Sequence, residues 1–228
     1  MSSHGRWFIT GTDTDVGKTF VTAALAAGAR SFGTVAAAKP IASGCTPSDP
    51  ARDAARIAHC AGHAPLEWAL APEAVSPHRA TLRPPFEPEA LRHWLGNLAA
   101  DTVLVEGVGG WRVPLHVQEA GATVTDLARW SGGRVLLVSA NRIGVLNHTL
   151  LTAEAIAHDG LELCGVILNN GAPAASDDVS RASNLEDLQA LLDVPVVTCE
   201  TLDLTSSDAT RSAGESLWRR LTCYRSSY

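Results

Sequence analysis

GTDTDVGKT, residues 11–19, follows the apolar run RWFIT at 6–10 and precedes the helix-forming stretch FVTAALAAGA at 20–29. The pattern G-x-x-x-x-G-K-[ST] is matched by Gly11, Gly17, Lys18 and Thr19. A position between a strand and a helix is the context that this pattern requires. The stretch therefore predicts a phosphate-binding loop; the alternative is an ordinary glycine-containing turn between a strand and a helix.

The chemistry of such a loop is specific. Its glycines let the backbone wrap closely, so that successive N–H groups and the positive end of the following helix face the phosphates. The lysine, here Lys18, reaches the β- and γ-phosphates, and the hydroxyl of Thr19 ligates Mg²⁺. We therefore expect this loop to bind a nucleoside triphosphate.

Short apolar runs alternate with helical patterns along the chain. The runs typical of strands lie at 6–10, 34–38, 102–106, 134–139, 163–169 and 194–197. The helical patterns lie at 18–30, 51–61, 87–99, 123–131, 147–158, 183–192 and 212–222. Several strand runs are continuously apolar, as expected for parallel strands covered on both faces. The alternation predicts an α/β fold of the P-loop NTPase type, with a mostly parallel central sheet and helices on both faces, in a single domain over 1–228.

Residues 62–86 form the irregular part of this pattern. Prolines stand at 65, 72, 77, 84 and 85 and interrupt any regular repeat. We expect the segment to be an excursion or a lid rather than a boundary between domains.

The composition argues against several classes of partner. The formal net charge is −6 and no basic run is present, which argues against nucleic acid or an anionic membrane surface. No apolar stretch approaches the roughly 18 residues that a membrane span needs. The five cysteines are odd in number and no pair is separated by only two residues, which suits a reducing compartment rather than disulfides or zinc. The N-terminal MSSHGR leads directly into a strand, so we expect no signal peptide and a cytoplasmic protein.

Lys39 stands out because the chain has kept so few lysines. Of 18 basic residues, only Lys18 and Lys39 are lysines. Pro40 biases Lys39 toward an extended conformation, so Lys39 should emerge at the carboxyl edge of the sheet, where open α/β folds place ligands. A second ammonium group there could stabilise negative charge beside the γ-phosphate. The alternative, a stray solvated lysine, is left open by composition alone.

Two acidic residues are candidates for a metal site. Glu106 ends the apolar run TVLVE, where a buried carboxylate is costly unless it is paired or binds a metal. Asp53 is more ambiguous: Asp49 is a natural N-cap followed by Pro50, so Asp53 could simply favour the helix dipole. Beside Thr19 and Glu106, Asp53 could equally help to hold Mg²⁺.

Two asparagines each allow two interpretations. Asn147 is expected to cap the helix at 147–158, and the same helix end would suit an anionic substrate. Asn169 ends the run LCGVILN and could be a turn residue before Gly171. Its amide could also pair with adenine, whose edge offers one donor and one acceptor.

Four segments together resemble the dethiobiotin synthetase family. They are GTDTDVGKT at 11–19, KPIASG at 39–44, VEGVGGWRVPL at 105–115 and GVLNHTLLT at 144–152. The resemblance extends from residue 8 to about residue 170, and the second and third segments are far more specific than the phosphate loop. After residue 170 it weakens: SNLEDLQALLDVPVV at 183–197 fits the expected helix and strand, but TCETLDL at 198–204 lacks the family's glycine-containing adenine loop.

The resemblance implies a specific reaction. One amine of 7,8-diaminopelargonate takes up CO₂ as a carbamate, whose oxygen attacks the γ-phosphate of ATP. The neighbouring amine then attacks the carbamic–phosphoric anhydride, closing the cyclic urea and releasing phosphate. Such a reaction needs positioned reactants and neutralised charge more than a general base, because the carbamate oxygen is already anionic.

The resemblance also implies roles for individual residues. Lys18 and Lys39 would be catalytic, with Lys39 holding the carbamate and the transferring phosphoryl group, while Mg²⁺ is implied at Thr19, Asp53 and Glu106. Contacts with ATP are implied for Thr14, Asp15, Val16, Gly17, Lys18, Thr19, Phe20, Asp53, Glu106, Gly107, Gly109, Asn169 and Asn170. Contacts with the substrate are implied for Ser43, Gly110, Pro114, Asn147 and His148, the last two across a homodimer interface.

Other interpretations of the same loop remain. An amide synthetase of the cobyrinic acid type normally carries a glutaminase domain, for which 228 residues leave little room. A partitioning-type switch ATPase usually has an additional lysine early in the phosphate loop, where this chain has Thr12. A degenerate relative that binds nucleotide without catalysis is disfavoured by the presence of Lys18, Thr19, Lys39 and Glu106.

Overall fold

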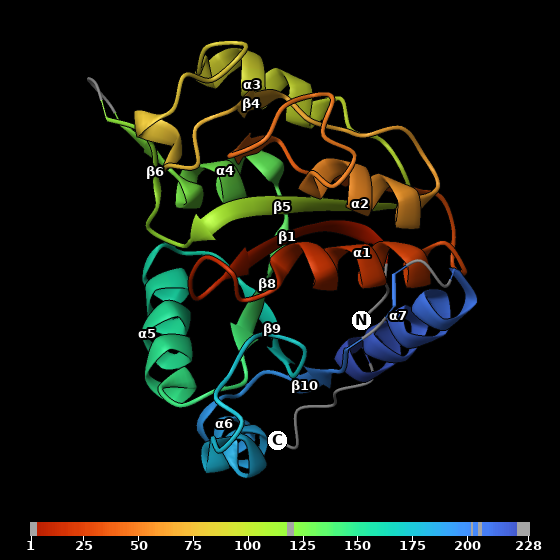
Figure 1. Ribbon diagram of the computed structural model, residues 1–228, viewed down its shortest axis with the longest axis vertical. Helices are drawn as coiled ribbons and strands as arrows, with labels where there is room; N and C mark the ends of the chain where they lie inside the picture. Colours follow the sequence, from red (N-terminus) through yellow and green to blue (C-terminus); the bar gives the residue numbers. More distant parts are fainter. Residues whose placement is uncertain (1–3, 118–120, 202, 205–206, 223–228) are drawn as a thin grey trace.

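The computed structural model describes residues 4–117, 121–201, 203–204 and 207–222. Its centre is a six-stranded sheet in the order β10-β9-β8-β1-β5-β2 (Figure 1). All neighbouring strands in this sheet are parallel. The strands are β1 (Gly5–Gly11), β2 (Val35–Ala38), β5 (Thr102–Gly110), β8 (Arg134–Ala140), β9 (Leu163–Asn169) and β10 (Val196–Cys199). The predicted parallel α/β sheet is thus confirmed.

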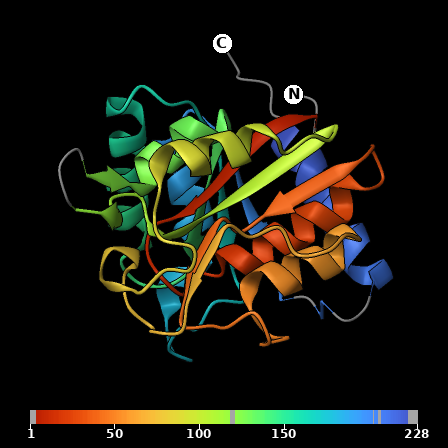
Figure 2. The same ribbon diagram turned by 90° about the horizontal axis from the view of Figure 1, so that it is seen from above.

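Helices cover both faces of this sheet. The helices are α1 (Lys18–Ala29), α2 (Asp53–Ala61), α3 (Pro88–Gly96), α4 (Val124–Ser131), α5 (Val145–His158), α6 (Asn184–Leu191) and α7 (Ser207–Thr222). Seen from above, α3 and α4 lie on one side of the strands, and α1 and α2 lie on the other (Figure 2). Figure 1 shows α7 beside α1.

The two faces bury separate apolar cores. On β1, Trp7 and Ile9 point into the core that α1, α2 and α7 cover, while Phe8 between them points into the core that α3, α4 and α5 cover. Successive side chains of a strand point to opposite faces, so both sets must be apolar when both faces are covered. This explains why the strand runs of the sequence are continuously apolar.

The segment predicted to be irregular contains two short elements that the sequence did not reveal. Within 62–86, β4 (Ala69–Ala71) pairs in parallel with β3 (Ile41–Ser43), and η1 (Pro77–Arg79) forms a 3₁₀ turn. Three residues are too few to show a period, and β4 depends on its partner strand, which no local pattern reveals. A second small pair, β6 (Pro114–His116) with β7 (Ala122–Thr123), is antiparallel.

The structure corrects two predicted helix starts. Helix α2 begins at Asp53 with Arg52 as its N-cap, and Asp49 instead accepts a hydrogen bond from the amide of Ala51 in the turn before it. Helix α5 begins at Val145 behind Gly144, whose φ of 88° suits a glycine, so Asn147 lies in the first turn and is not the N-cap. At both helix starts the backbone conformation of the N-cap residue, Arg52 or Gly144, sets where the helix begins. The residues with good capping side chains, Asp49 and Asn147, are not the N-caps.

Three further elements are shifted or added. Helix α3 ends at Gly96 rather than at 99, α7 begins at Ser207 rather than at 212, and η2 (Val179–Ala182) precedes α6. Among the residues described, no helix combines the length and the apolar character needed to cross a bilayer.

Candidate active site

The loop between β1 and α1 has the backbone that phosphate binding requires. Asp15 and Gly17 have φ values of 58° and 90°, and helix α1 begins directly after Gly17. A Cβ atom on Gly17 would overlap the side-chain amide nitrogen of Asn169. Glycine is therefore required at this position both by the left-handed backbone and by the close approach of β9.

Lys18 crosses this loop. Its Nζ donates a hydrogen bond of 2.7 Å to the carbonyl oxygen of Asp13. The contact holds the ammonium group over the loop, which is the place where phosphates would meet the free N–H groups at the start of α1.

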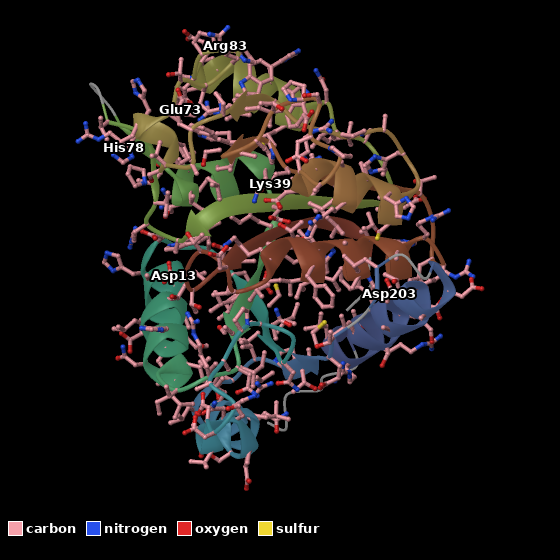
Figure 3. All side chains as sticks on the ribbon, in the orientation of Figure 1. Asp13, Lys39, Glu73, His78, Arg83 and Asp203 are labelled. Atoms are coloured by element: carbon pink, nitrogen blue, oxygen red, sulfur yellow. The ribbon has the colours of Figure 1, made fainter. Side chains whose placement is uncertain are left out.

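A charge cluster, in which Lys39 and Glu106 are buried and Asp53 is partly exposed, lies at the carboxyl edge of the neighbouring strands. Lys39, which follows β2, places its Nζ 2.6 Å from Oε1 of Glu106 and 3.4 Å from Oδ2 of Asp53. The same ammonium group donates to the carbonyl oxygen of Gly107 at 2.8 Å. Figure 3 shows Lys39 against β5, the strand that carries Glu106. A lysine and a glutamate can be buried this deeply because each neutralises the other.

Thr19 connects this cluster to the phosphate loop. Its Oγ1 donates a 2.8 Å hydrogen bond to Oε1 of Glu106, the oxygen that Lys39 also contacts. The structure thus brings together Thr19, Lys39, Asp53 and Glu106, four residues separated by up to 87 positions in the chain. Their assignment to metal binding and catalysis stays a prediction.

The two lysines differ in how firmly they hold their protons. Burial, together with the positive charge of Lys39, lowers the pKa of Lys18 to about 8. The nearby carboxylates act in the opposite direction but do not outweigh these two effects. Burial by itself would also lower the pKa of Lys39, but Glu106 and Asp53 outweigh burial and hold that pKa above its usual value. Lys39 is therefore a permanent cation, while Lys18 titrates near pH 8 when no phosphate is bound.

The pKa of Lys18 makes nucleotide affinity depend on pH. Phosphates bind the ammonium form, so the affinity has its full value well below pH 8 and falls as the pH rises through 8. We expect the Kd for Mg-ATP, measured by calorimetry, to rise about tenfold between pH 7 and pH 9. In Lys18→Arg, whose guanidinium stays charged over this range, the profile should be flat. A flat profile in the unaltered protein would contradict the assignment.

The oxygen atoms of this cluster fit Mg²⁺. Oε2 of Glu106 is buried and has no hydrogen-bond partner among the described residues, so a ligand oxygen is available there. Hydroxyl and carboxylate oxygens are the donors that Mg²⁺ prefers, together with substrate phosphates and water. Across the described residues, no group of three or more His, Cys, Asp or Glu side chains is arranged to hold a metal by itself. Thr19, Asp53 and Glu106 would therefore hold Mg²⁺ together with the phosphates of a bound nucleotide.

The asparagines at the end of β9 already have protein partners. Asn169 is buried; its Nδ2 donates to the carbonyl oxygen of Val16 at 2.9 Å, and its Oδ1 accepts from the amide of Gly171 at 3.0 Å. Asn170 accepts from Asn141 at 2.7 Å and donates to Glu200 at 2.6 Å. Asn169 thus fastens the phosphate loop to β9, a role that the sequence did not reveal; contact of either asparagine with adenine stays a prediction.

A depression of about 430 Å³ lies between the phosphate loop and α5. It is lined by Thr12, Asp13, Gly110, Trp111, Arg112, Val113, Pro114, Leu151, Thr152 and Ala155. Figure 3 shows Asp13 between the end of β1 and α5. The sequence singled out Gly110 and Pro114 from this set but missed the others, although Trp111, Arg112, Leu151 and Thr152 lie within the segments that carry the family resemblance.

The remaining predicted site residues lie around this region. Ser43 ends β3, and Asn147 and His148 lie in the first turn of α5, outside the lining of the depression. Residues of the loop and strand differ in exposure: Thr14 and Asp15 are exposed, Val16 is buried, Phe20 packs at the edge of the core, and Gly109 has a φ of 61°.

Comparison with known proteins decides the family. Residues 6–202 match a family model described as an AAA domain. An ATP-dependent dethiobiotin synthetase of Pseudomonas aeruginosa (strain UCBPP-PA14) is 44% identical over 185 residues, which cover 75% of this chain and 79% of the relative. The enzyme of the same name from Aromatoleum aromaticum is 39% identical over 209 residues, covering 86% of this chain and 90% of the relative. The chain belongs to the dethiobiotin synthetase family.

Two solved structures share the fold of this dethiobiotin synthetase family member. The septum site-determining protein MinD of Pyrococcus horikoshii, complexed with Mg-ADP, has a TM-score of 0.50 at 18% identity, covering 95% of this chain and 93% of MinD. A putative plasmid partition protein of Borrelia burgdorferi, bound to AMPPNP, has a TM-score of 0.55 at 9% identity, covering 98% and 100%. At such identities the likeness shows the fold alone, so it does not favour the switch-ATPase alternative.

Proposed function

We propose that this protein is an ATP-dependent dethiobiotin synthetase, a ligase that closes the cyclic urea of dethiobiotin from 7,8-diaminopelargonate and CO₂. Its family membership supports the overall activity. The observation that carries the reaction chemistry is the meeting of Lys39, Glu106 and Thr19 at the phosphate loop, with Nζ of Lys39 and Oγ1 of Thr19 on the same carboxylate oxygen. A permanent cation beside a phosphate loop, in addition to the lysine of the loop itself, suits a reaction in which two anions must approach each other.

The proposed reaction has three steps. One amine of the substrate adds to CO₂ and loses a proton, forming a carbamate. The carbamate oxygen bonds to the γ-phosphorus while the bond to ADP breaks. The second amine then bonds to the carbamate carbon, phosphate leaves, and the nitrogen loses a proton. ATP thus turns a poor leaving group into a good one.

The side chains of this protein would neutralise the charges of the carbamate and the phosphates and hold them in position. Lys39 would hold the carbamate oxygen next to the γ-phosphate, since its buried ammonium group stays charged. Lys18 would exchange the carbonyl oxygen of Asp13 for phosphate oxygens, which raises its pKa again. Mg²⁺, held through Thr19, Asp53 and Glu106, would supply further neutralisation of phosphate charge.

We further propose that the diamine occupies the depression beside α5. Gly110 and Pro114 line it, and Ser43, Asn147 and His148 would complete the site, the last two from a second copy of the chain in a homodimer. Asp13 offers a carboxylate on the wall next to the phosphate loop, where an amine is expected. The apolar side chain of Leu151 on the opposite wall suits the hydrocarbon chain of the substrate.

A single assay separates this function from its alternatives. The protein is mixed with Mg-ATP, bicarbonate and 7,8-diaminopelargonate, and release of phosphate is followed. We expect release to require both bicarbonate and the diamine. Release with ATP alone would indicate a switch ATPase, and release that requires a carboxylate substrate with glutamine or ammonia would indicate an amide synthetase.

A further inference from the structure

Asp159 joins three elements next to the depression. It caps the C-terminal end of α5, and its side chain is 11% exposed. Oδ2 accepts a 2.8 Å hydrogen bond from Nε1 of Trp111 and lies 2.8 Å from Nη1 of Arg112, both in the turn after β5. The backbone carbonyl of Asp159 accepts a 2.9 Å hydrogen bond from Nη2 of Arg129 on α4.

These contacts connect the two walls of the depression. Residues 110–114, from the end of β5 to the start of β6, form one wall, and Leu151, Thr152 and Ala155 of α5 form the other. Asp159 lies one turn beyond Ala155 on the same helix and binds the first wall directly through Trp111 and Arg112. Asp159 is therefore one direct polar link between the two walls, beside the apolar packing of Trp111 in the core that also contains Ile156 of α5.

Asp159 is built to stay ionised. Burial would raise the pKa of its carboxyl group, but the hydrogen bonds from Trp111 and Arg112 and the charges of Arg112 and Arg129 bring that pKa below its usual value. An ionised acceptor makes the hydrogen bond from the buried indole stronger than a neutral one would. The backbone of Trp111 is also held, because Thr125 Oγ1 donates a 3.2 Å hydrogen bond to its carbonyl oxygen.

We propose that Asp159 is a positioning residue for the diamine: by holding Trp111 and Arg112 against the end of α5, it sets the distance between the walls that grip the substrate. The inference rests on the proposed function, because it assigns the depression to the diamine. It concerns a residue outside the charge cluster around Lys39, so its loss should affect the diamine and leave the nucleotide alone.

The test compares KM values in the phosphate-release assay. Asp159→Ala should raise the KM for the diamine about tenfold and leave the KM for ATP within about twofold, because a charged hydrogen bond is lost at one site only. Asp159→Asn keeps an acceptor for the indole N–H and should fall between Asp159→Ala and the unaltered protein. The matched control is Asp101→Asn: Asp101 also accepts hydrogen bonds, from the amide and hydroxyl of Thr34, but precedes β5 at the opposite edge of the sheet.

Each outcome of the KM comparison supports or contradicts the role of Asp159. Equal rises of both KM values, no change of the diamine KM in Asp159→Ala, or the same effect in Asp101→Asn would overturn the inference. If Asp159→Ala does not fold, Asp159→Asn carries the same comparison, because it removes the charge that pairs with Arg112 and Arg129 and keeps an acceptor for the indole N–H. If the unaltered protein releases no phosphate in response to the diamine, the proposed function itself fails, and this inference fails with it.

Discussion

Lys39→Ala is expected to lower the turnover of dethiobiotin formation by roughly 10²–10³, the usual loss when one preorganised charge partner of the transition state is removed. The Kd for Mg-ATP should change little, because the phosphate loop and Lys18 remain. The reason is the position of Lys39, which is buried, permanently charged and next to the loop without being part of it. Rapid-quench measurement of turnover and calorimetric measurement of ATP binding check the two halves of this expectation.

The same substitution also affects folding, which the design must separate from catalysis. Without Lys39, the carboxylate of Glu106 stays buried with its main cation removed, which typically costs about 3–5 kcal/mol unless the group takes up a proton. Lys39→Met keeps the packed stem and removes only the charge, and Lys39→Met with Glu106→Gln removes the stranded carboxylate as well. Full turnover in a folded variant without the charge would show that Lys39 has no role in the chemistry.

Lys18→Ala is expected to weaken ATP binding and turnover together. The ammonium group lies over the loop on the carbonyl oxygen of Asp13 and would pass to the phosphates when the nucleotide binds. Losing a charged contact of this kind should raise the Kd for Mg-ATP by about 10- to 100-fold and lower turnover by at least as much. The two variants should therefore differ in ATP affinity: Lys18→Ala should raise the Kd for Mg-ATP and Lys39→Ala should not. Calorimetry measures this difference directly.

The folding stability of Lys18→Ala serves as a control for its loss of binding. Lys18 pays a burial penalty that lowers its pKa to about 8, so alanine at this position should not destabilise the fold as the loss of Lys39 does. Lys18→Arg keeps a charge at the loop and should retain part of the affinity. Unchanged ATP affinity in Lys18→Ala would refute the assignment of 11–19 as the phosphate loop of this protein.

Local patterns were sufficient for the main elements of the fold. The six strands of the central sheet and the seven helices all appear near their predicted places, because each buries an apolar face whose spacing is visible in the sequence. Helix starts were less predictable: Asp49 and Asn147 have good capping side chains, yet the helices begin at Asp53 and Val145. The short strands β3, β4, β6 and β7 were missed, since two or three residues carry no period and each depends on its partner strand.

By itself, the sequence determined the strand–loop–helix motif at 11–19 and the parallel α/β sheet, because such a motif and apolar periodicity are local properties. The tertiary structure alone decided which oxygen Lys39 and Thr19 share, why Gly17 must face Asn169, and that Asp159 ties α5 to the turn after β5. These contacts join residues from separate strands and helices, and their strength depends on burial. Distance and burial are properties of the packed chain, and no stretch of sequence contains them.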